Sequence, residues 1–255
     1  MKINELSRYM DERIPKTLSC SWDNDGLMCC PDGEREVKRA LFCMDVTPQA
    51  IDYAIEGGFD LIISHHPLIF HGLKSISGDN NIPARVIKLI KNDISVMSFH
   101  TRFDALDGGV NDALADIFEL SNIEKVVCDG SELMRVGYLP SEMSIDDFAQ
   151  LVKEKLGCEH LNYAAYTGRV HRLAIVGGGG GSFTQNARAA GADTFLSGDI
   201  GYHTLTDCRD NQINLIEAGH YFTENPTLKN LAKIVLEADS NIEYELYETN
   251  IIKHI

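Results

Sequence analysis

The chain alternates short apolar strands with helices, a pattern that leaves few fold classes open. KRALFCMDV (38–46) has the apolar run of a buried strand, and Thr47-Pro48 then begins a helix, with threonine as N-cap and proline in the first turn. Gly57-Gly58 ends that helix, and DLIIS (60–64) forms a second buried strand. Strands and helices at this spacing predict βαβ units, and therefore an α/β layer.

The same order returns in the second half of the chain. The expected elements there are a helix, a strand, a helix and a strand, at 145–156, 171–176, 184–190 and 193–197. EGGFDLIISHH (56–66) and AAGADTFLSGD (189–199) match at an offset of 133 residues, with Asp60 on Asp193 and Ser64 on Ser197. Any two βαβ units resemble each other, but a recurrence in order favours an internal duplication. We therefore expect two similar α/β domains, with mixed sheets flanked by helices.

Domain limits follow less directly from the pattern. We expect a metal-binding domain from residues 1–125 plus 225–255, and a second domain from 126–224 that contributes residues at their interface. The tail at 241–250 alternates apolar and acidic residues and predicts a half-exposed edge strand. Between residues 121 and 140 no clear pattern survives, and a domain crossing is expected there.

Composition excludes several classes of protein. The net charge of −15 and the pI near 4.9 disfavour nucleic-acid binding, which needs a basic face. No apolar segment is long enough to span a bilayer, and the charged N-terminal segment predicts a helix, with Leu6, Met10 and Ile14 on one face, rather than a signal peptide. Seven cysteines without a C-x-x-C motif predict reduced thiols. A cytoplasmic protein is expected.

Two adjacent histidines follow the strand at 60–64. Inside a strand, His65 and His66 would face opposite ways, but at its end, before Pro67, both can turn into one pocket. Imidazoles are poor core residues unless their nitrogens have partners. The pair is equally compatible with a metal site and with a hydrogen-bonded structural role.

Two further segments carry candidate ligands. His220 and Glu224 would share one face of a helix beginning at residue 220, although such a pair is also common on solvated surfaces. His100 and Asp104 follow the strand-like run at 94–99, where an Asx turn before a helix fits equally well.

Taken together, these segments predict a metal centre. His65, His66, Asp104, His220 and Glu224 are too many ligands for one tetrahedral zinc with its water, and they suit two divalent ions, of zinc, manganese, iron or cobalt. His100 and His203 are candidates for a proton shuttle or for orienting a ligand, and so is Asp199.

Two other motifs have less specific interpretations. The run Gly177–Gly181 lies between a strand and a helix, where backbone amides can hold an anion, but it matches neither nucleotide-binding fingerprint and is favoured as a flexible turn. Trp22, the only tryptophan, lies in a segment of acids and glycine that we interpret as a packed loop.

Five motifs, in order, resemble one family. They are SWDNDGL (21–27), SHHPLIFHG (64–72), HTRFDALDGGVND (100–112), SGDIGYH (197–203) and EAGHYFTE (217–224). The chain resembles, from about residue 3 to 250, the dinuclear-metal family related to the Ngg-interacting factor, whose bacterial members are labelled GTP cyclohydrolase 1 type 2 homologs. It is similar to the short form of that family, without a middle insertion.

The resemblance implies two similar α/β domains and a toroidal homohexamer whose metal sites face an inner cavity. It carries the ligand role onto His65, His66, Asp104, His220 and Glu224. Gly201 departs from the family pattern, in which many relatives have lysine, and this casts doubt on an anion contact at that position.

Two functions follow as hypotheses. The first is a metal-dependent hydrolase acting on a nucleotide or a related small polar substrate, by ring opening as in a GTP cyclohydrolase or by phosphoester hydrolysis. The alternative is a non-enzymatic hexameric metal-binding scaffold or regulatory protein. A DNA-acting repair factor is weaker because of the charge of −15.

Overall fold

The computed structural model describes residues 1–252, which divide into two compact units. The first unit consists of Met1–Phe103 and Leu228–Ile251, and the second is built on Asp104–Thr227. The domain extents expected from the sequence, 1–125 plus 225–255 and 126–224, stay a prediction.

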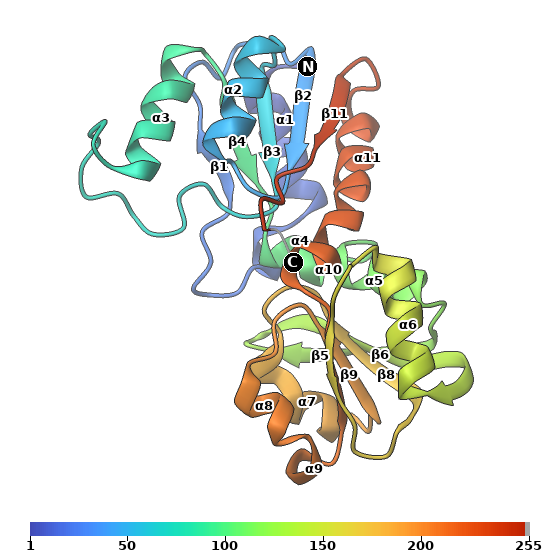
Figure 1. Cartoon of the computed structure of the whole chain (residues 1–255). Helices are drawn as coiled ribbons and strands as arrows, with labels where there is room; N and C mark the ends of the chain where they lie inside the picture. Colours follow the sequence, from blue (N-terminus) through green and yellow to red (C-terminus); the bar gives the residue numbers. More distant parts are fainter. Residues whose placement is uncertain (253–255) are drawn as a thin grey trace. The chain divides into compact units, whose positions relative to one another are not determined.

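The first unit contains a five-stranded mixed sheet in the order β1-β4-β3-β2-β11. Its strands are β1 (Gly26–Cys29), β2 (Arg39–Cys43), β3 (Leu61–Ser64), β4 (Ser95–Ser98) and β11 (Glu243–Tyr247). Its helices are α1 (Ile3–Arg13), η1 (Lys16–Leu18), α2 (Pro48–Glu56), α3 (Asn81–Lys91) and α11 (Leu228–Ala238). All strand pairs are parallel except β1 with β4. Helix α2 lies in front of this sheet in Figure 1 and α1 behind it, so the sheet is covered on both faces.

The second unit contains a six-stranded mixed sheet in the order β5-β6-β8-β9-β10-β7. Its strands are β5 (Ser121–Cys128), β6 (Ser131–Ser144), β7 (Asn162–Ala164), β8 (Arg169–Val176), β9 (Thr194–Ser197) and β10 (Asn214–Glu217). Its longer helices are α5 (Val110–Ile117), α6 (Ile145–Leu156) and α7 (Thr184–Ala189). Shorter ones are η2 (Gly181–Phe183), α8 (Tyr202–Thr206), α9 (Cys208–Asn211), α10 (His220–Glu224) and η3 (Asn225–Thr227), and α4 (Thr101–Ala105) crosses the boundary between the units. Strands β8, β9 and β10 are parallel.

The predicted α/β class with two similar domains is confirmed. In each unit, three consecutive parallel strands are joined by helical crossovers, β2-β3-β4 in the first and β8-β9-β10 in the second. Strands β3 and β9 are buried at every residue, as expected for parallel strands covered on both faces.

Local sequence signals explain where several helices begin and end. The Thr47 hydroxyl accepts a hydrogen bond from the Ala50 amide, and Ser144 accepts one from the Asp147 amide. Gly157 ends α6 in the left-handed conformation that glycine adopts without strain. The predicted strand at 38–46 is shorter than expected, because only Arg39–Cys43 pairs within the sheet.

The segment in which no pattern was recognised, 121–140, forms most of an antiparallel hairpin of β5 and β6. Nearly all of β5 is exposed, so hydrophobic alternation could not reveal it. The turn Asp129-Gly130, with both residues at positive φ, was the signal that could have found it.

Two observations concern the remaining sequence expectations. The seven cysteines are free thiols, and all but Cys30 are buried. Within residues 1–252, none of the helices combines the length and the apolar character that crossing a membrane would require.

Candidate metal centre

In the first unit, candidate residues gather where three parallel strands end. Strands β2, β3 and β4 run in the same direction, so the segments after them share one edge of the sheet. Asp45 follows β2, His65 and His66 follow β3, and His100 follows β4. Catalytic and binding groups of α/β sheets collect at this edge.

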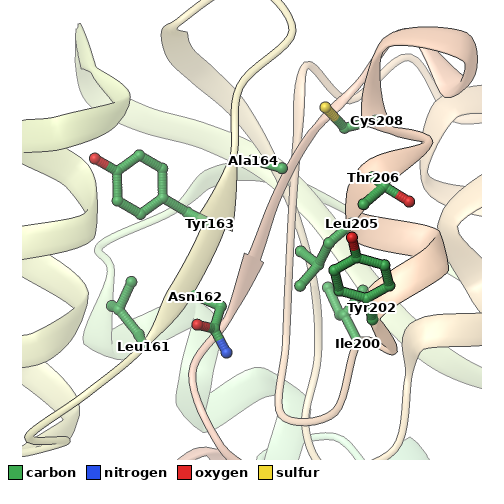
Figure 2. A pocket seen from close by; sticks show the side chains of 9 residues that line it. All are labelled: Leu161, Asn162, Tyr163, Ala164, Ile200, Tyr202, Leu205, Thr206 and Cys208. Carbon is green, nitrogen blue, oxygen red and sulfur yellow. The ribbon is translucent and has the colours of Figure 1, made fainter.

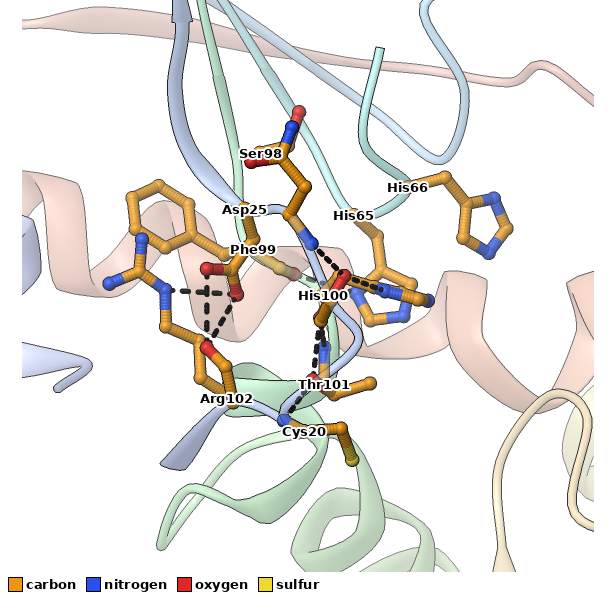
Figure 3. A network of polar contacts seen from close by, with 12 residues as sticks. Cys20, Asp25, His65, His66, Ser98, Phe99, His100, Thr101 and Arg102 are labelled. Carbon is orange, nitrogen blue, oxygen red and sulfur yellow. Dashed lines mark hydrogen bonds and ion pairs between the residues drawn. The ribbon is translucent and has the colours of Figure 1, made fainter. Parts of the chain in front are cut away.

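Three histidine rings lie together at that edge. The ring centroids of His65 and His66 are 5.2 Å apart, and the ring of His100 lies 5.4 Å from His65 and 5.7 Å from His66. Each ring has a nitrogen within 4.8 Å of a nitrogen of the other two, a spacing that one metal ion can bridge. Figure 3 shows the three side chains turned into one region.

The Nδ1 atoms of the paired histidines are held by oxygen acceptors. His65 Nδ1 lies 2.9 Å from the Phe99 carbonyl oxygen, and His66 Nδ1 lies 2.9 Å from Asp45 Oδ1. A carbonyl oxygen only accepts, so His65 carries its proton on Nδ1. In this tautomer the lone pair is on Nε2, which is how metal-binding histidines are oriented.

His100 is held in the same way by Asp23. Its Nδ1 lies 2.9 Å from Asp23 Oδ1, and the backbone amide of Thr101 donates to Asp23 Oδ2 at 3.0 Å. Burial by itself raises the pKa of Asp23, but the hydrogen bonds from His100 and Thr101 outweigh it and lower the pKa to about 2. Asp23 is therefore an anion, and it orients the His100 ring.

Behind this cluster, Arg102 anchors the segment that carries it. Its side chain is fully buried, with Nε 3.1 Å from Asp25 Oδ2 and Nη1 2.7 Å from Asp11 Oδ1 (Figure 3 draws the Asp25 contact). Nη1 also donates to the Ile14 carbonyl oxygen. Burial raises the pKa of Asp25 more than the guanidinium lowers it. This network joins α1, the loop before β1 and α4.

In the second unit, a His–carboxylate group occupies the equivalent edge. His220 begins α10, after β10, and its Nδ1 lies 2.6 Å from Oδ2 of Asp199, which follows β9. His220 Nε2 lies 3.2 Å from Glu224 Oε2 one helical turn on, and the Glu224 side chain is 4% exposed. The predicted helical pairing of His220 with Glu224 is therefore present. Asp199 holds the ring, as the carboxylates behind metal-binding histidines do.

The two carboxylates make His220 strongly basic. Burial by itself lowers the pKa of His220, but the hydrogen bonds with Asp199 and Glu224 outweigh it and raise the pKa to about 10. A position that stabilises a proton between two acidic groups is one that attracts a cation.

The glycine run Gly177–Gly181 packs against this group. Four of its five amides donate within the unit rather than to an anion: Gly177 to Asn111 Oδ1, Gly178 to Thr223 Oγ1, Gly180 to Ser197 Oγ and Gly181 to the Asp199 carbonyl. A Cβ on Gly178 would overlap Glu224 Oε1 and lie 3.0 Å from His220 Nε2. Glycine is required there because the backbone passes directly beside the two side chains.

Asp104 lies on α4 and His203 on α8, and the interpretation of Trp22 as part of a packed loop was wrong. Asp104 is a buried residue of α4, and its carbonyl accepts from Asn111 Nδ2. His203 is exposed on α8, with its ring 5.5 Å from that of Tyr202. Trp22 is 50% exposed and is not a packed anchor, because its neighbours are the rings of Phe70 and His100 rather than the core.

The residues after Asp199 also line a pocket of about 730 Å³ in the second unit. Ile200, Tyr202, Leu205 and Thr206 lie on one side of it, facing the edge strand β7 (Figure 2). The Tyr163 side chain points away from it, and its hydroxyl donates to Asp146. None of the lining residues carries a formal charge.

The comparisons with known proteins agree with these observations. The family model of Duf34/NIF3 (NGG1p interacting factor 3) matches residues 1–254. The chain belongs to this family. Buried histidine, aspartate and glutamate groups among its described residues could hold a metal ion.

Individual relatives cover almost the whole chain. A protein of Clostridium perfringens named GTP cyclohydrolase 1 type 2 homolog is 34% identical over 250 residues, which is 96% of this chain and 95% of the relative. A protein of Clostridium acetobutylicum with the same name is 33% identical, covering 91% and 89%. The crystal structure of a Staphylococcus aureus hypothetical protein superposes with a TM-score of 0.90 at 29% identity, over 100% of this chain and 99% of that one.

Proposed function

We propose that this protein is a metal-dependent hydrolase acting on a nucleotide or a related small polar substrate. Its proposed ligands for two divalent ions are His65, His66, Asp104, His220 and Glu224. The donor set of imidazole and carboxylate fits zinc, manganese, iron or cobalt. The relatives' name, GTP cyclohydrolase 1 type 2 homolog, supports a purine nucleotide as substrate.

One observation carries the proposal: three of the proposed histidine ligands have an oxygen acceptor at Nδ1. Phe99 O, Asp45 and Asp199 serve His65, His66 and His220, respectively. A purely structural role would not require the same ring nitrogen to be fixed in all three histidines. The repeated arrangement instead presents Nε2 as the ligand atom.

Bound divalent ions would supply a Lewis acid and a water of lowered pKa. The residues of this chain would position the substrate and transfer protons to or from it. Because Asp23 fixes its Nδ1, His100 has Nε2 for accepting or donating a proton, as a histidine oriented by a carboxylate does in general acid–base catalysis. His203 stays a second candidate for proton transfer.

The decisive experiment replaces Glu224 with glutamine, which keeps the size of the side chain and removes its charge. Metal content would be measured by mass spectrometry, and turnover with GTP and with model phosphodiesters. Glu224→Gln should lose both metal and turnover, whereas Glu159→Ala, at an exposed position, should keep both. Turnover unaffected by Glu224→Gln or by chelation would refute the proposal.

The alternative is a non-enzymatic metal-binding scaffold or regulatory protein, and the relatives' label "homolog" favours keeping it. Metal-loaded protein that turns over none of these substrates above the Glu224→Gln background would support it.

For either function we propose a toroidal homohexamer, testable by light scattering. The free thiols support a reducing compartment, the cytoplasm.

A further inference from the structure

Two large aromatic side chains of the first unit lie open to solvent beside the histidine cluster. Trp22 is 50% exposed and Phe70 is 39% exposed. Their ring centroids are 6.0 Å apart, and those of Trp22 and Phe70 lie 6.1 Å and 6.2 Å from the ring of His100. Because His100 lies 5.4 Å from His65 and 5.7 Å from His66, a continuous series of rings leads from the exposed pair to proposed metal ligands.

The segments that carry the two rings are fixed. Asn24 Nδ2 donates to the Ile69 carbonyl oxygen, which joins the segment after Trp22 to the one before Phe70. Asp23, next to Trp22, binds His100 Nδ1 and the Thr101 amide. The two rings of Trp22 and Phe70, called the platform below, are therefore preorganised, which lowers the entropy cost of binding a ligand.

The platform continues into a pocket large enough for part of a small molecule. Residues 67–75 and 80–83 line a pocket of about 530 Å³, which is within the range of ligand sites. Phe70 belongs both to this pocket and to the exposed pair of rings. Lys74 is the cation among the lining residues, and Asn80 and Asn81 add amide groups. An occupant with a ring and an anionic or polar part fits these groups.

The Asp23 side chain beside Trp22 is buried, so the aromatic rings rather than a carboxylate are open to a ligand here. The carboxylate beside Trp22, Asp23, accepts hydrogen bonds at both oxygens, from His100 and from Thr101. Every nucleobase has a π face, so each of them can stack on tryptophan and phenylalanine.

We propose that Trp22 and Phe70 form the subsite that stacks the planar heteroaromatic ring of the substrate, a nucleobase. The inference rests on the proposed function, because it assigns the ring-binding part of the same site. It places the base beside His100, and the rest of the nucleotide toward the histidine cluster or the Lys74 pocket.

The sequence provides a direct probe, since Trp22 is the only tryptophan. Its emission would be followed while guanosine, and separately ribose 5-phosphate, is added to the full-length protein. Guanosine should quench the emission saturably, and ribose 5-phosphate should not. Equal quenching by both, or by neither, would overturn the proposal.

Substitutions measured by calorimetry separate stacking from general effects. Trp22→Ala and Phe70→Ala should each weaken guanosine binding about 5- to 100-fold, the range for removing an aromatic ring from beneath a base. Trp22→Phe, which keeps a ring, should lose much less affinity. Tyr166→Ala removes an aromatic ring of similar exposure (45%) in the second unit and should change nothing. Equal affinities for Trp22→Ala and Tyr166→Ala would contradict the assignment.

Glu224→Gln distinguishes failure of this inference from failure of the proposed function. If guanosine still quenches Trp22 in the Glu224→Gln variant, the result supports the subsite. If the same variant has lost metal and turnover, that result supports the proposed function. Quenching in a protein that never turns over a nucleotide supports a binding site without catalysis. Emission that is already shielded from acrylamide, and becomes accessible on dilution, would show that a second copy covers the rings and would overturn the proposal.

Discussion

Asp60 and Asp193 bind equivalent backbone amides in the two halves of the chain. Asp60 Oδ2 accepts from the amides of Lys38 and Arg39, at 2.9 Å and 3.1 Å. Asp193 Oδ2 accepts from those of His171 and Arg172, at 3.0 Å and 2.8 Å. Donors and acceptors are displaced by the same 133 residues, the offset found in the sequence. Each aspartate binds the preceding strand just before the point where the two strands begin to pair, at Ala40 and at Leu173.

Neighbouring features repeat at the same offset. Gly58 and Gly191 both have positive φ, +66° and +80°. The Phe59 amide donates to the Ala54 carbonyl, and the Ala192 amide donates to the Ala187 carbonyl. The same helix-to-strand connection therefore occurs in both units, and individual hydrogen bonds support the duplication.

Replacing either aspartate by alanine should destabilise its own unit. Asp60→Ala leaves two amides and the Arg35 guanidinium without their acceptor. Asp193→Ala leaves two amides and the Thr194 hydroxyl, which are neutral donors, without theirs. We expect about 1–3 kcal/mol in each case, with the larger loss for Asp60→Ala. Urea unfolding monitored by circular dichroism measures this. Asp210→Ala, at an exposed position of α9, is the control, and an equal effect there would contradict the explanation.

Stability should fall in acid through Asp23. The pKa of Asp23 is lowered from 3.8 to about 2 in the folded protein. A lowered folded-state pKa gives stability that is present above pH 3.8 and lost as the pH falls through about 2. Asp23→Asn should flatten the stability profile between pH 4 and pH 2 relative to the unmodified chain. An unchanged slope of unfolding free energy over that window would exclude this role.

Gly178→Ala should disturb the His220–Glu224 group. The added methyl overlaps Glu224 Oε1, and the φ of +63° disfavours a side chain by about 1–2 kcal/mol. We expect lower metal content and a lower melting temperature. Gly179→Ala is a matched control one residue on, because a Cβ there meets nothing within 4 Å. Equal metal content in the two variants would show that Gly178 does not protect the site.

Asp199→Ala should weaken metal binding without touching a proposed ligand. Loss of the carboxylate behind His220 frees the ring to rotate, and such losses cost about 10- to 100-fold in metal affinity. Competition with a chelating dye measures the affinity. Asp199→Asn, which still accepts from Nδ1, should recover part of it, and the exposed Asp210→Ala should not differ from the unmodified protein.

Arg102→Met should destabilise the first unit by about 3–5 kcal/mol, because it leaves Asp25 buried without its guanidinium. Arg169→Met, at a position where the side chain is 76% exposed, should cost less than about 0.5 kcal/mol. Chemical denaturation of both variants checks the contrast. A small effect at Arg102 would show that the network of Figure 3 does not hold the segment in place.

The sequence by itself determined the elements whose signals are local. The Thr47 cap, the glycine at the end of α6 and the buried strand β3 are set by neighbours in the chain, so pattern and propensity were sufficient. The duplication was also visible, because equivalent backbone conformations demand the same residue types, such as Gly58 and Gly191. His220 and Glu224 could be paired because one helical turn separates them.

Only the tertiary structure decided which groups hold the candidate ligands. Asp45 reaches His66 from another strand end, Asp23 reaches His100 across 77 positions, and Asp199 reaches His220 from β9. The exposure of Trp22 and the close approach of Gly178 to Glu224 are equally non-local. Such contacts depend on the order and direction of strands within a sheet, and spacing along the chain does not specify them.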